Sequence, residues 1–279
     1  MHHYKLLALK NRNILQKTDS YKIMKSEIIK TPIATNPDQV QKMFEAGAHY
    51  AYTRTKRHPS VKTFIFGAKN DTEIFDLEKT NVSLEEAKNF IKEVFTKAGS
   101  QTLFVASKNE AKNIVKEIAE AVNAPVVYNR WVGGTLTNFD MTKKRVALLK
   151  KLKDEREKGD LMKYTKRERL QIDKKIAKLE KKFLGIAEMP TLPACMFVVD
   201  PKHEAVAVQE ALLKNIPVIA LANSDCNIKM IDFPIMANDS AGESVKFFTK
   251  EIASACKITA PKTETEEAPK KETVRTRKY

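Results

Sequence analysis

Short apolar runs alternate with amphipathic stretches along most of the chain, and this alternation predicts the fold class. Apolar runs bounded by Gly, Pro or polar clusters are typical of strands buried on both faces of a parallel sheet. Between them, apolar residues recur at every third or fourth position, as on the buried face of a helix. The pattern predicts an α/β fold with a doubly wound, mainly parallel sheet. We interpret as strands the runs 102–106, 125–128, 194–200, 218–222 and 233–236.

Helices are expected in the amphipathic stretches, and some of them carry start signals. Residues 83–86 (Ser-Leu-Glu-Glu) form a capping-box pattern, which predicts that a helix over 84–97 begins there. Ser107 or Asn109 is expected to cap the next helix, over 110–122. Further helices are expected over 39–47, over 204–214 and from about 240 to 255.

Two short runs near the N-terminal side of the sheet, 63–67 and 73–77, predict a β-hairpin. The residues between them suit a turn, and the sheet is expected to be parallel apart from this hairpin. The stretch before it, 48–62, mixes aromatic and basic residues, and its part 53–62 is interpreted as a basic loop.

Residues 140–184 interrupt the alternation of strand and helix. Each half of this segment places its apolar residues on one face, and 158–160 separates the halves. The pattern predicts a helical hairpin with coiled-coil-like packing that projects from the sheet domain. Its apolar faces are Met141, Leu148, Leu149 and Leu152 in the first half and Leu170, Ile172, Ile176, Leu179 and Phe183 in the second.

The chain is basic, with 50 Lys and Arg against 35 Asp and Glu and a formal net charge of +15. The excess lies in four segments, and the rest of the chain is net negative. An acidic body with basic extensions is typical of proteins that bind a polyanion. Ordinary solvated surface charge is the alternative, but four separate basic segments favour nucleic acid. The segments are 1–35, 53–62, 140–184 and 257–279.

Other features of the composition limit the compartment and the partners. No apolar run reaches the length of a membrane span, so no membrane partner is expected. The N-terminus lacks the apolar centre and the cleavage site of a signal peptide, and Met1 and Met24 are both candidate starts. Cys195, Cys226 and Cys256 are odd in number and far apart, which predicts buried thiols in a reducing cytosol.

The only Gly-Gly pair, Gly133 and Gly134, lies where a predicted strand meets a predicted helix. Open α/β sheets place ligand crevices at such junctions. The pattern is neither GxGxxG nor GxxxxGK[ST], so a mononucleotide site is poorly supported. A tight turn beside a packed Trp131, with Thr137 or Asn138 capping the following helix, is the alternative.

Asp200, His203 and Glu204 form the most tempting catalytic cluster, because Asp200 follows a predicted strand. We favour a helix-capping role for Asp200, since Pro201 suits a first helical turn. No catalytic residue, metal ligand or cofactor is therefore assigned. The alternative function is a flavodoxin-like enzyme that binds a nucleotide or a sugar phosphate.

The candidate RNA-binding residues come from the basic segments and the Gly-Gly junction. Residues 53–62 hold four bases and no acid, which suits contacts with phosphates. The outward bases of a projecting hairpin are a second means of gripping RNA backbone. The candidates are Arg54, Lys56, Arg57, Lys62, Arg130, Lys143, Lys144, Arg145, Lys166 and Arg167.

Residues 130–138, Arg-Trp-Val-Gly-Gly-Thr-Leu-Thr-Asn, resemble the signature of the small-subunit ribosomal protein S2 family, bacterial type. The resemblance continues at collinear motifs and spans roughly 39–257. Those motifs are 46–49, 64–67, 76–80, 197–200, 216–221 and 238–239.

The resemblance implies a flavodoxin-like parallel sheet with an inserted coiled-coil hairpin and no catalytic activity. It implies binding to small-subunit rRNA and to neighbouring ribosomal proteins, with the large ribosomal protein S1 as a candidate partner. A cytoplasmic, ribosome-bound protein that is not a homo-oligomer is expected. The expected parts are a flexible basic arm (1–36), a sheet domain (37–139 and 185–256), the hairpin (140–184) and a disordered tail (257–279).

Overall fold

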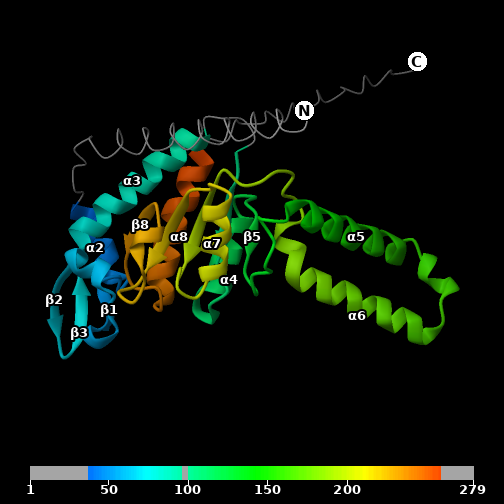
Figure 1. Cartoon of the computed structure of the whole chain (residues 1–279), viewed down its shortest axis with the longest axis horizontal. Helices are drawn as coiled ribbons and strands as arrows, with labels where there is room; N and C mark the ends of the chain where they lie inside the picture. Colours follow the sequence, from blue (N-terminus) through cyan, green and yellow to red (C-terminus); the bar gives the residue numbers. More distant parts are fainter. Residues whose placement is uncertain (1–36, 96–99, 259–279) are drawn as a thin grey trace, which may run out of the picture.

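The computed structural model describes residues 37–95 and 100–258, and its body is a five-stranded sheet (Figure 1). The strands, in spatial order, are β5 (Val126–Val127), β4 (Thr102–Val105), β6 (Cys195–Val199), β7 (Val218–Ala222) and β8 (Phe233–Met236). All neighbouring pairs are parallel, which confirms the fold class. β4, β6 and β7 are buried at every residue, as expected for continuous apolar runs.

Separate hydrophobic cores lie on the two faces of the sheet, because successive side chains of a strand point to opposite sides. The helices of the body are α3 (Leu77–Phe95), α4 (Asn109–Glu120), α7 (Ala205–Leu213) and α8 (Gly242–Ile258). α3, α4 and α8 cover the face that carries Phe104. α7 covers the face that carries Leu103, together with the root of the hairpin. The two covered faces make the sheet doubly wound.

The predicted β-hairpin belongs to a separate, smaller sheet. This unit consists of α2 (Pro37–Glu45), β1 (Tyr50–Thr53), β2 (Ile65–Lys69) and β3 (Thr72–Phe75). The three strands are antiparallel in the order β1-β3-β2, so the expectation that the hairpin joins the main sheet was wrong. A two-stranded hairpin buries too little surface alone, and β1, which was not predicted from the sequence, supplies the third strand.

α3 begins earlier than the sequence pattern predicted. Asp76 Oδ1 accepts from two backbone N–H groups of the first turn, at 3.2 and 3.4 Å. The hydroxyl of Thr80 donates to the carbonyl of Met236 on β8 at 2.7 Å, which ties this turn to the sheet. Ser83 therefore lies inside the helix, and the expected capping box there was wrong.

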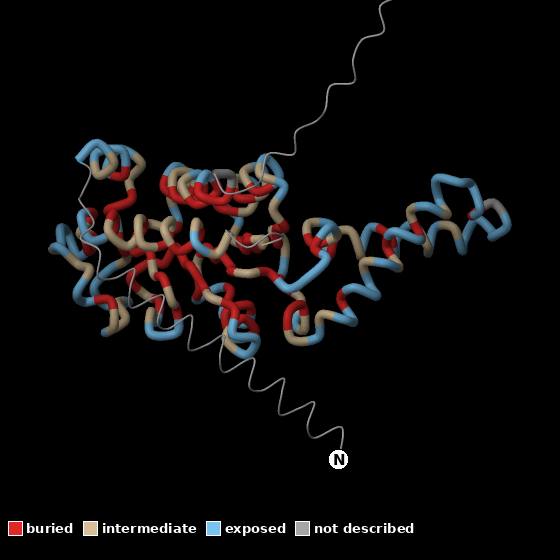
Figure 2. Tube along the Cα trace, turned by 90° about the horizontal axis from the view of Figure 1, so that it is seen from above, coloured by how far each residue is buried: buried red, intermediate tan, exposed pale blue. Residues whose placement is uncertain are grey.

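The inserted segment forms two antiparallel helices, α5 (Phe139–Glu157) and α6 (Lys166–Phe183), that project away from the sheet (Figure 1). Figure 2 shows that the projecting part is mostly exposed, with buried positions along the seam. Leu149, Leu152 and Ile176 are buried there. Met141 and Leu170, which the periodicity placed on the apolar faces, are 43% and 53% exposed. The prediction that these two residues lie in the buried seam was therefore wrong. The seam between the two helices buries fewer residues than the helical periodicity indicated.

The chain re-enters the body at a close contact between Gly185 and β5. A Cβ atom at Gly185 would lie 2.0 Å from the carbonyl oxygen of Val126, so only glycine fits. The hairpin is therefore anchored to the sheet by backbone packing as well as by apolar side chains such as Phe183 and Ile186.

The Gly-Gly loop wraps around one carboxylate, that of Glu210 on α7. Glu210 Oε1 accepts from Trp131 Nε1 at 3.1 Å and from the backbone N–H of Gly134 at 2.7 Å. Oε2 accepts from the N–H groups of Leu136 and Thr137, both at 3.0 Å. Gly134 has φ +91°, which aims its N–H at the carboxylate and favours glycine. Trp131 is 8% exposed at the hairpin root, which confirms that it is packed.

The expected helix caps are used differently in the structure. The hydroxyl of Thr137 donates to Glu210 at 3.1 Å, and Asn138 occupies the N-cap of α5 without a side-chain bond. The N-cap of α4 likewise has no side-chain bond, so the expected capping by Ser107 or Asn109 was wrong. Asp200 does not cap α7 either, because the N-cap of that helix is Glu204, without a side-chain bond. The carboxylate of Asp200 instead accepts from the N–H of His203 at 3.1 Å, in the turn before the helix.

The remaining expectations concern the cysteines and the chain ends. All three cysteines are free and buried, as predicted, and burial raises the pKa of Cys195 to about 12. Residues 1–36 and 259–279, which hold the expected arm and most of the expected tail, lie outside the described residues. No helix in the described part of the chain is both long enough and apolar enough to traverse a bilayer.

Replacing Trp131 by Ala is expected to lower the free energy of unfolding by about 3–5 kcal/mol, because it removes a buried aromatic ring. Urea unfolding followed by circular dichroism measures this change. Trp131→Phe keeps most of the ring but loses the N–H donor, so its cost should be smaller. Wild-type stability of Trp131→Ala would contradict the core role of the ring.

A pH dependence follows from Glu210. Burial alone raises the pKa of Glu210, but the hydrogen bonds from Thr137, Trp131, Gly134 and Leu136 bring it below its ordinary value of 4.5. A carboxyl with a lowered folded-state pKa contributes stability that is complete above its unfolded-state pKa and is lost as pH falls through the folded-state pKa. The stabilisation from Glu210 should therefore fade below about pH 4.5.

Glu210→Gln tests this linkage, because the amide places an NH₂ group among N–H donors. The variant should unfold about 3 kcal/mol more easily than the wild type at pH 7. The difference should shrink as pH falls below about 4.5, when wild-type Glu210 itself becomes protonated. Glu117→Gln, at an exposed position on α4, is the control and should leave stability unchanged. A difference that stays constant with pH would contradict the linkage.

Candidate nucleic-acid interface

The carboxyl ends of β4 and β6 flank the switch point of the sheet, where doubly wound folds bind their ligands. Ser107 follows β4, and both its hydroxyl and its backbone N–H donate to Oε1 of Glu204, the N–H at 3.1 Å. Glu204 is 3% exposed, and His203 Nδ1 lies 3.2 Å from the same oxygen. An internal carboxylate therefore takes the donors that a ligand phosphate would use.

A second group of charges closes the same edge of the sheet. Lys108 Nζ lies 3.0 Å from Asp239 Oδ2 and 3.4 Å from Asp200 Oδ2. Burial lowers the pKa of Lys108, but the two carboxylates outweigh it and raise the pKa above its ordinary value. For Asp239, by contrast, burial raises the pKa, and the nearby carboxylate of Asp200 raises it further. One ammonium between two carboxylates leaves this edge unsuited to a phosphate.

The same reasoning applies to the Gly-Gly loop, whose backbone donors form an anion-binding nest that Glu210 fills. Both places where this fold would bind a phosphate therefore hold a glutamate of the α7 region. Across residues 37–95 and 100–258, no three His, Cys, Asp or Glu side chains gather in a way that could hold a metal ion.

The basic loop between β1 and β2 presents exposed cations with no acidic residue among them. It consists of two short 3-10 segments, η1 (Arg54–Lys56) and η2 (Pro59–Phe64). The side chains of Arg54, Lys56 and Lys62 are exposed, as RNA contact requires. Lys56 Nζ lies 5.6 Å from the ring centroid of Tyr52, so this cation packs beside an aromatic face.

Arg57 differs from the other three bases of this loop. Its guanidinium lies 2.6 Å from Glu73 Oε1, and the two side chains are 22% and 2% exposed. The charge of buried Glu73, which is distant in sequence, requires a partner, and Arg57 supplies it. The guanidinium of Arg57 is thus engaged mainly in an ion pair within the protein.

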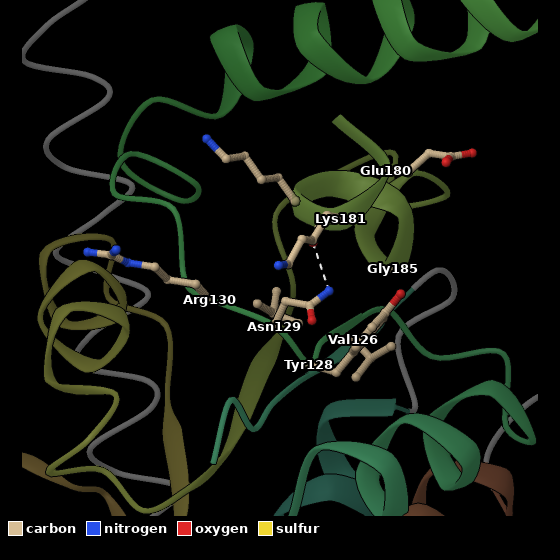
Figure 3. A pocket seen from close by; sticks show the side chains of 9 residues that line it. Val126, Tyr128, Asn129, Arg130, Glu180, Lys181 and Gly185 are labelled. Atoms are coloured by element: carbon tan, nitrogen blue, oxygen red, sulfur yellow. Dashed lines mark hydrogen bonds between the residues drawn. The ribbon is translucent and has the colours of Figure 1, made fainter. Parts of the chain in front are cut away.

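Arg130 lies at the root of the hairpin, where the loop after β5 meets the end of α6. Figure 3 shows the small polar cavity there, with Arg130, Asn129 and Lys181 around it. Asn129 Nδ2 donates to the carbonyl of Lys181 at 2.9 Å, which holds the two segments together. Arg130, Lys181 and Lys182 are exposed, so the root adds basic charge from both segments.

The predicted bases of the hairpin are exposed but do not form one site. Lys143, Lys144 and Arg145 lie near the start of α5, at the root. Lys166 and Arg167 lie in the first turn of α6, at the tip. A helix of this length spans roughly 28 Å, so the two groups can contact only different parts of an RNA.

Several exposed residues of this surface were not among those predicted from the sequence. Lys69, Lys181 and Lys182 are exposed beside the predicted bases. Phe44, Tyr50 and Phe66 are 60%, 53% and 81% exposed around the basic loop. Lys69 had a signal in the sequence, because the acid-free stretch 50–69 continues beyond residue 62, where the basic segment was taken to end. Lys181 and Lys182 lie in the basic segment 140–184. Exposure of the aromatic rings had no local signal.

Comparison with known proteins bears on the whole described region. The family model of ribosomal protein S2 matches residues 43–258. The chain is 39% identical over 218 residues to small ribosomal subunit protein uS2 of Chloroflexus aggregans, covering 77% of this chain and 90% of that protein. The uS2 protein of Roseiflexus sp. is 40% identical over 213 residues, which cover 76% of this chain and 81% of that protein. The uS2 protein of Borreliella burgdorferi is 38% identical over 216 residues, which cover 77% and 83%.

These matches cover most of the chain, including the sheet, the Gly-Gly loop and the inserted hairpin. The chain belongs to the ribosomal protein S2 family.

Proposed function

We propose that this protein is a structural constituent of the small ribosomal subunit and binds small-subunit rRNA mainly through backbone phosphates. The proposal rests on the distribution of charge in this chain of the S2 family, with carboxylates inside the fold and cations on its surface. The phosphate-binding positions of the fold hold internal carboxylates, whereas Arg54, Lys56 and Lys62 stand exposed. The exposed cations suit a polyanion on the outside of the molecule.

The hydrogen bonds of Glu204 and Glu210 argue against the alternative function, a flavodoxin-like enzyme. A nucleotide or sugar phosphate would have to displace Glu204 or Glu210 from its hydrogen bonds, leaving a buried carboxylate without donors. The relatives are named as ribosomal proteins, a structural family without catalytic activity of its own.

The proposal extends to partners and location. Neighbouring small-subunit proteins are expected contacts, and ribosomal protein S1 is one candidate among them. The hairpin suits such contacts because its two helices stand clear of the body (Figure 1). The protein is proposed to be cytoplasmic and ribosome-bound, without forming homo-oligomers.

Sedimentation tests the ribosomal role directly. In gradients of native extracts at low magnesium, the protein should run with the separated small subunit. At high magnesium it should run with whole ribosomes. A protein that stays at the top of the gradient under both conditions would contradict the proposed function.

Salt dependence tests the basic loop. The triple variant Arg54→Ala, Lys56→Ala, Lys62→Ala leaves Arg57 in place. Replacing Arg57 as well would leave the buried carboxylate of Glu73 without its ion-pair partner. Each lost phosphate contact reduces the slope of log affinity against log salt by about 0.9, so the slope for rRNA fragments should flatten by about 2–3.

The control variant removes the same charge from another part of the surface, at Lys214, Lys246 and Lys250, which are not part of the loop. Its slope should stay close to that of the wild type. Equal flattening in both variants would show that only net charge matters, and an unchanged slope in the loop variant would shift the contact to the hairpin.

A further inference from the structure

The small sheet exposes aromatic rings in an ordered arrangement. Phe44, at the end of α2, stacks on His49 with ring centroids 4.4 Å apart and an interplanar angle of 12°. His49 in turn contacts Tyr50, at the start of β1, with centroids 4.0 Å apart. His49 is buried between two rings that are 60% and 53% exposed. We call these three residues the aromatic ridge.

A fourth ring lies nearby on the same small sheet. Phe66 is 81% exposed on β2, the edge strand opposite β1. The register with β3 shifts between Ile65 and Gly67, so Phe66 occupies a bulge and is pushed outward. Neighbouring strands lie about 4.8 Å apart, so β1 and β2 are separated by about 10 Å across β3.

Charge identifies the chemistry of the partner. The chain from Tyr50 to Lys69, which carries both edge strands and the basic loop, contains no acidic residue. Arg54, Lys56, Lys62 and Lys69 are exposed along it. Exposed aromatic rings beside a stretch of chain with basic and no acidic side chains fit a polyanion that also carries flat rings. Single-stranded RNA has both features, whereas a duplex presents only phosphates because its bases are already stacked.

We propose that the aromatic ridge and Phe66 form a stacking platform for unpaired RNA bases, next to a loop that holds the adjoining phosphates. The inference rests on the proposed function and deepens it, since it names single-stranded RNA as the ligand of this end of the molecule. The hairpin lies at the opposite end (Figure 1), so the platform is a second, independent RNA contact.

The test uses the full-length protein with a single-stranded oligoadenylate of about 12 nucleotides and the duplex that it forms with oligouridylate. The double variant Phe44→Leu, Phe66→Leu keeps the positions apolar but removes two flat rings. Its affinity for the single strand should fall about tenfold or more, and its affinity for the duplex should stay within about twofold. The salt slope should not change, because no charge is removed.

Two controls separate stacking from other causes. Phe44→Trp in a Phe66→Leu background should restore part of the lost affinity, because Trp also offers a flat face. Leu213→Ala removes an exposed apolar residue of α7 and should bind like the wild type. Thermal unfolding should show all these variants folded, since the substituted residues are exposed.

Three results would overturn the platform. One is a double Leu variant that binds the single strand as tightly as the wild type. Another is an equal loss for single strand and duplex. The third comes from a photocrosslinking phenylalanine analogue at position 66 in intact small subunits: crosslinks to protein alone would make this a protein-docking surface. Failure of the proposed function itself looks different, because the wild type would then neither sediment with subunits nor bind rRNA fragments.

Discussion

The carboxylate of Glu210 holds together the part of the molecule where sheet, loop and hairpin meet. It accepts hydrogen bonds from the indole of Trp131, from three backbone N–H groups and from the hydroxyl of Thr137. Because these donors span the loop that leads into α5, one charge on α7 sets where the hairpin begins. A buried carboxylate is costly when unpaired, so the loop and the helix stabilise each other only when both are folded.

This arrangement changes what the fold can do. Doubly wound sheets bind phosphates with backbone N–H groups at the ends of their strands. Here Glu204 and Glu210 take those donors, and Lys108 is held between Asp200 and Asp239. The sheet is therefore a scaffold whose internal polar groups satisfy one another. Its excess basic charge lies on loops and on the hairpin, where long side chains stay in water until a polyanion approaches.

The hairpin and the small sheet extend the body in opposite directions (Figure 1). The hairpin has a narrow buried seam, centred on Leu149 and Ile176, and otherwise exposed, charged surfaces. The small sheet combines exposed rings with the acid-free loop. An rRNA that touched both ends would contact the protein at widely separated places. Such contacts favour a fixed orientation of the protein, because phosphate contacts position a protein without reading sequence.

The sequence by itself determined the features that depend on neighbouring residues. The continuous apolar runs predicted the strands from 102 to 236, and the three- and four-residue steps around Ile176 predicted the projecting hairpin. The Gly-Gly loop with its single Trp marked the hairpin root and the resemblance that the family match confirmed.

The tertiary structure alone decided where the polar groups find their partners. Arg57, chosen as an RNA contact from local charge, is bound to Glu73. Ser107 and Thr137, expected as helix caps, donate to Glu204 and Glu210, which are more than 70 residues away in sequence. Periodicity acts within a few residues and is visible in any window of the chain. A buried charge, by contrast, must be satisfied wherever the fold brings a partner, so its bonds follow the packing of the sheet and not the order of the sequence.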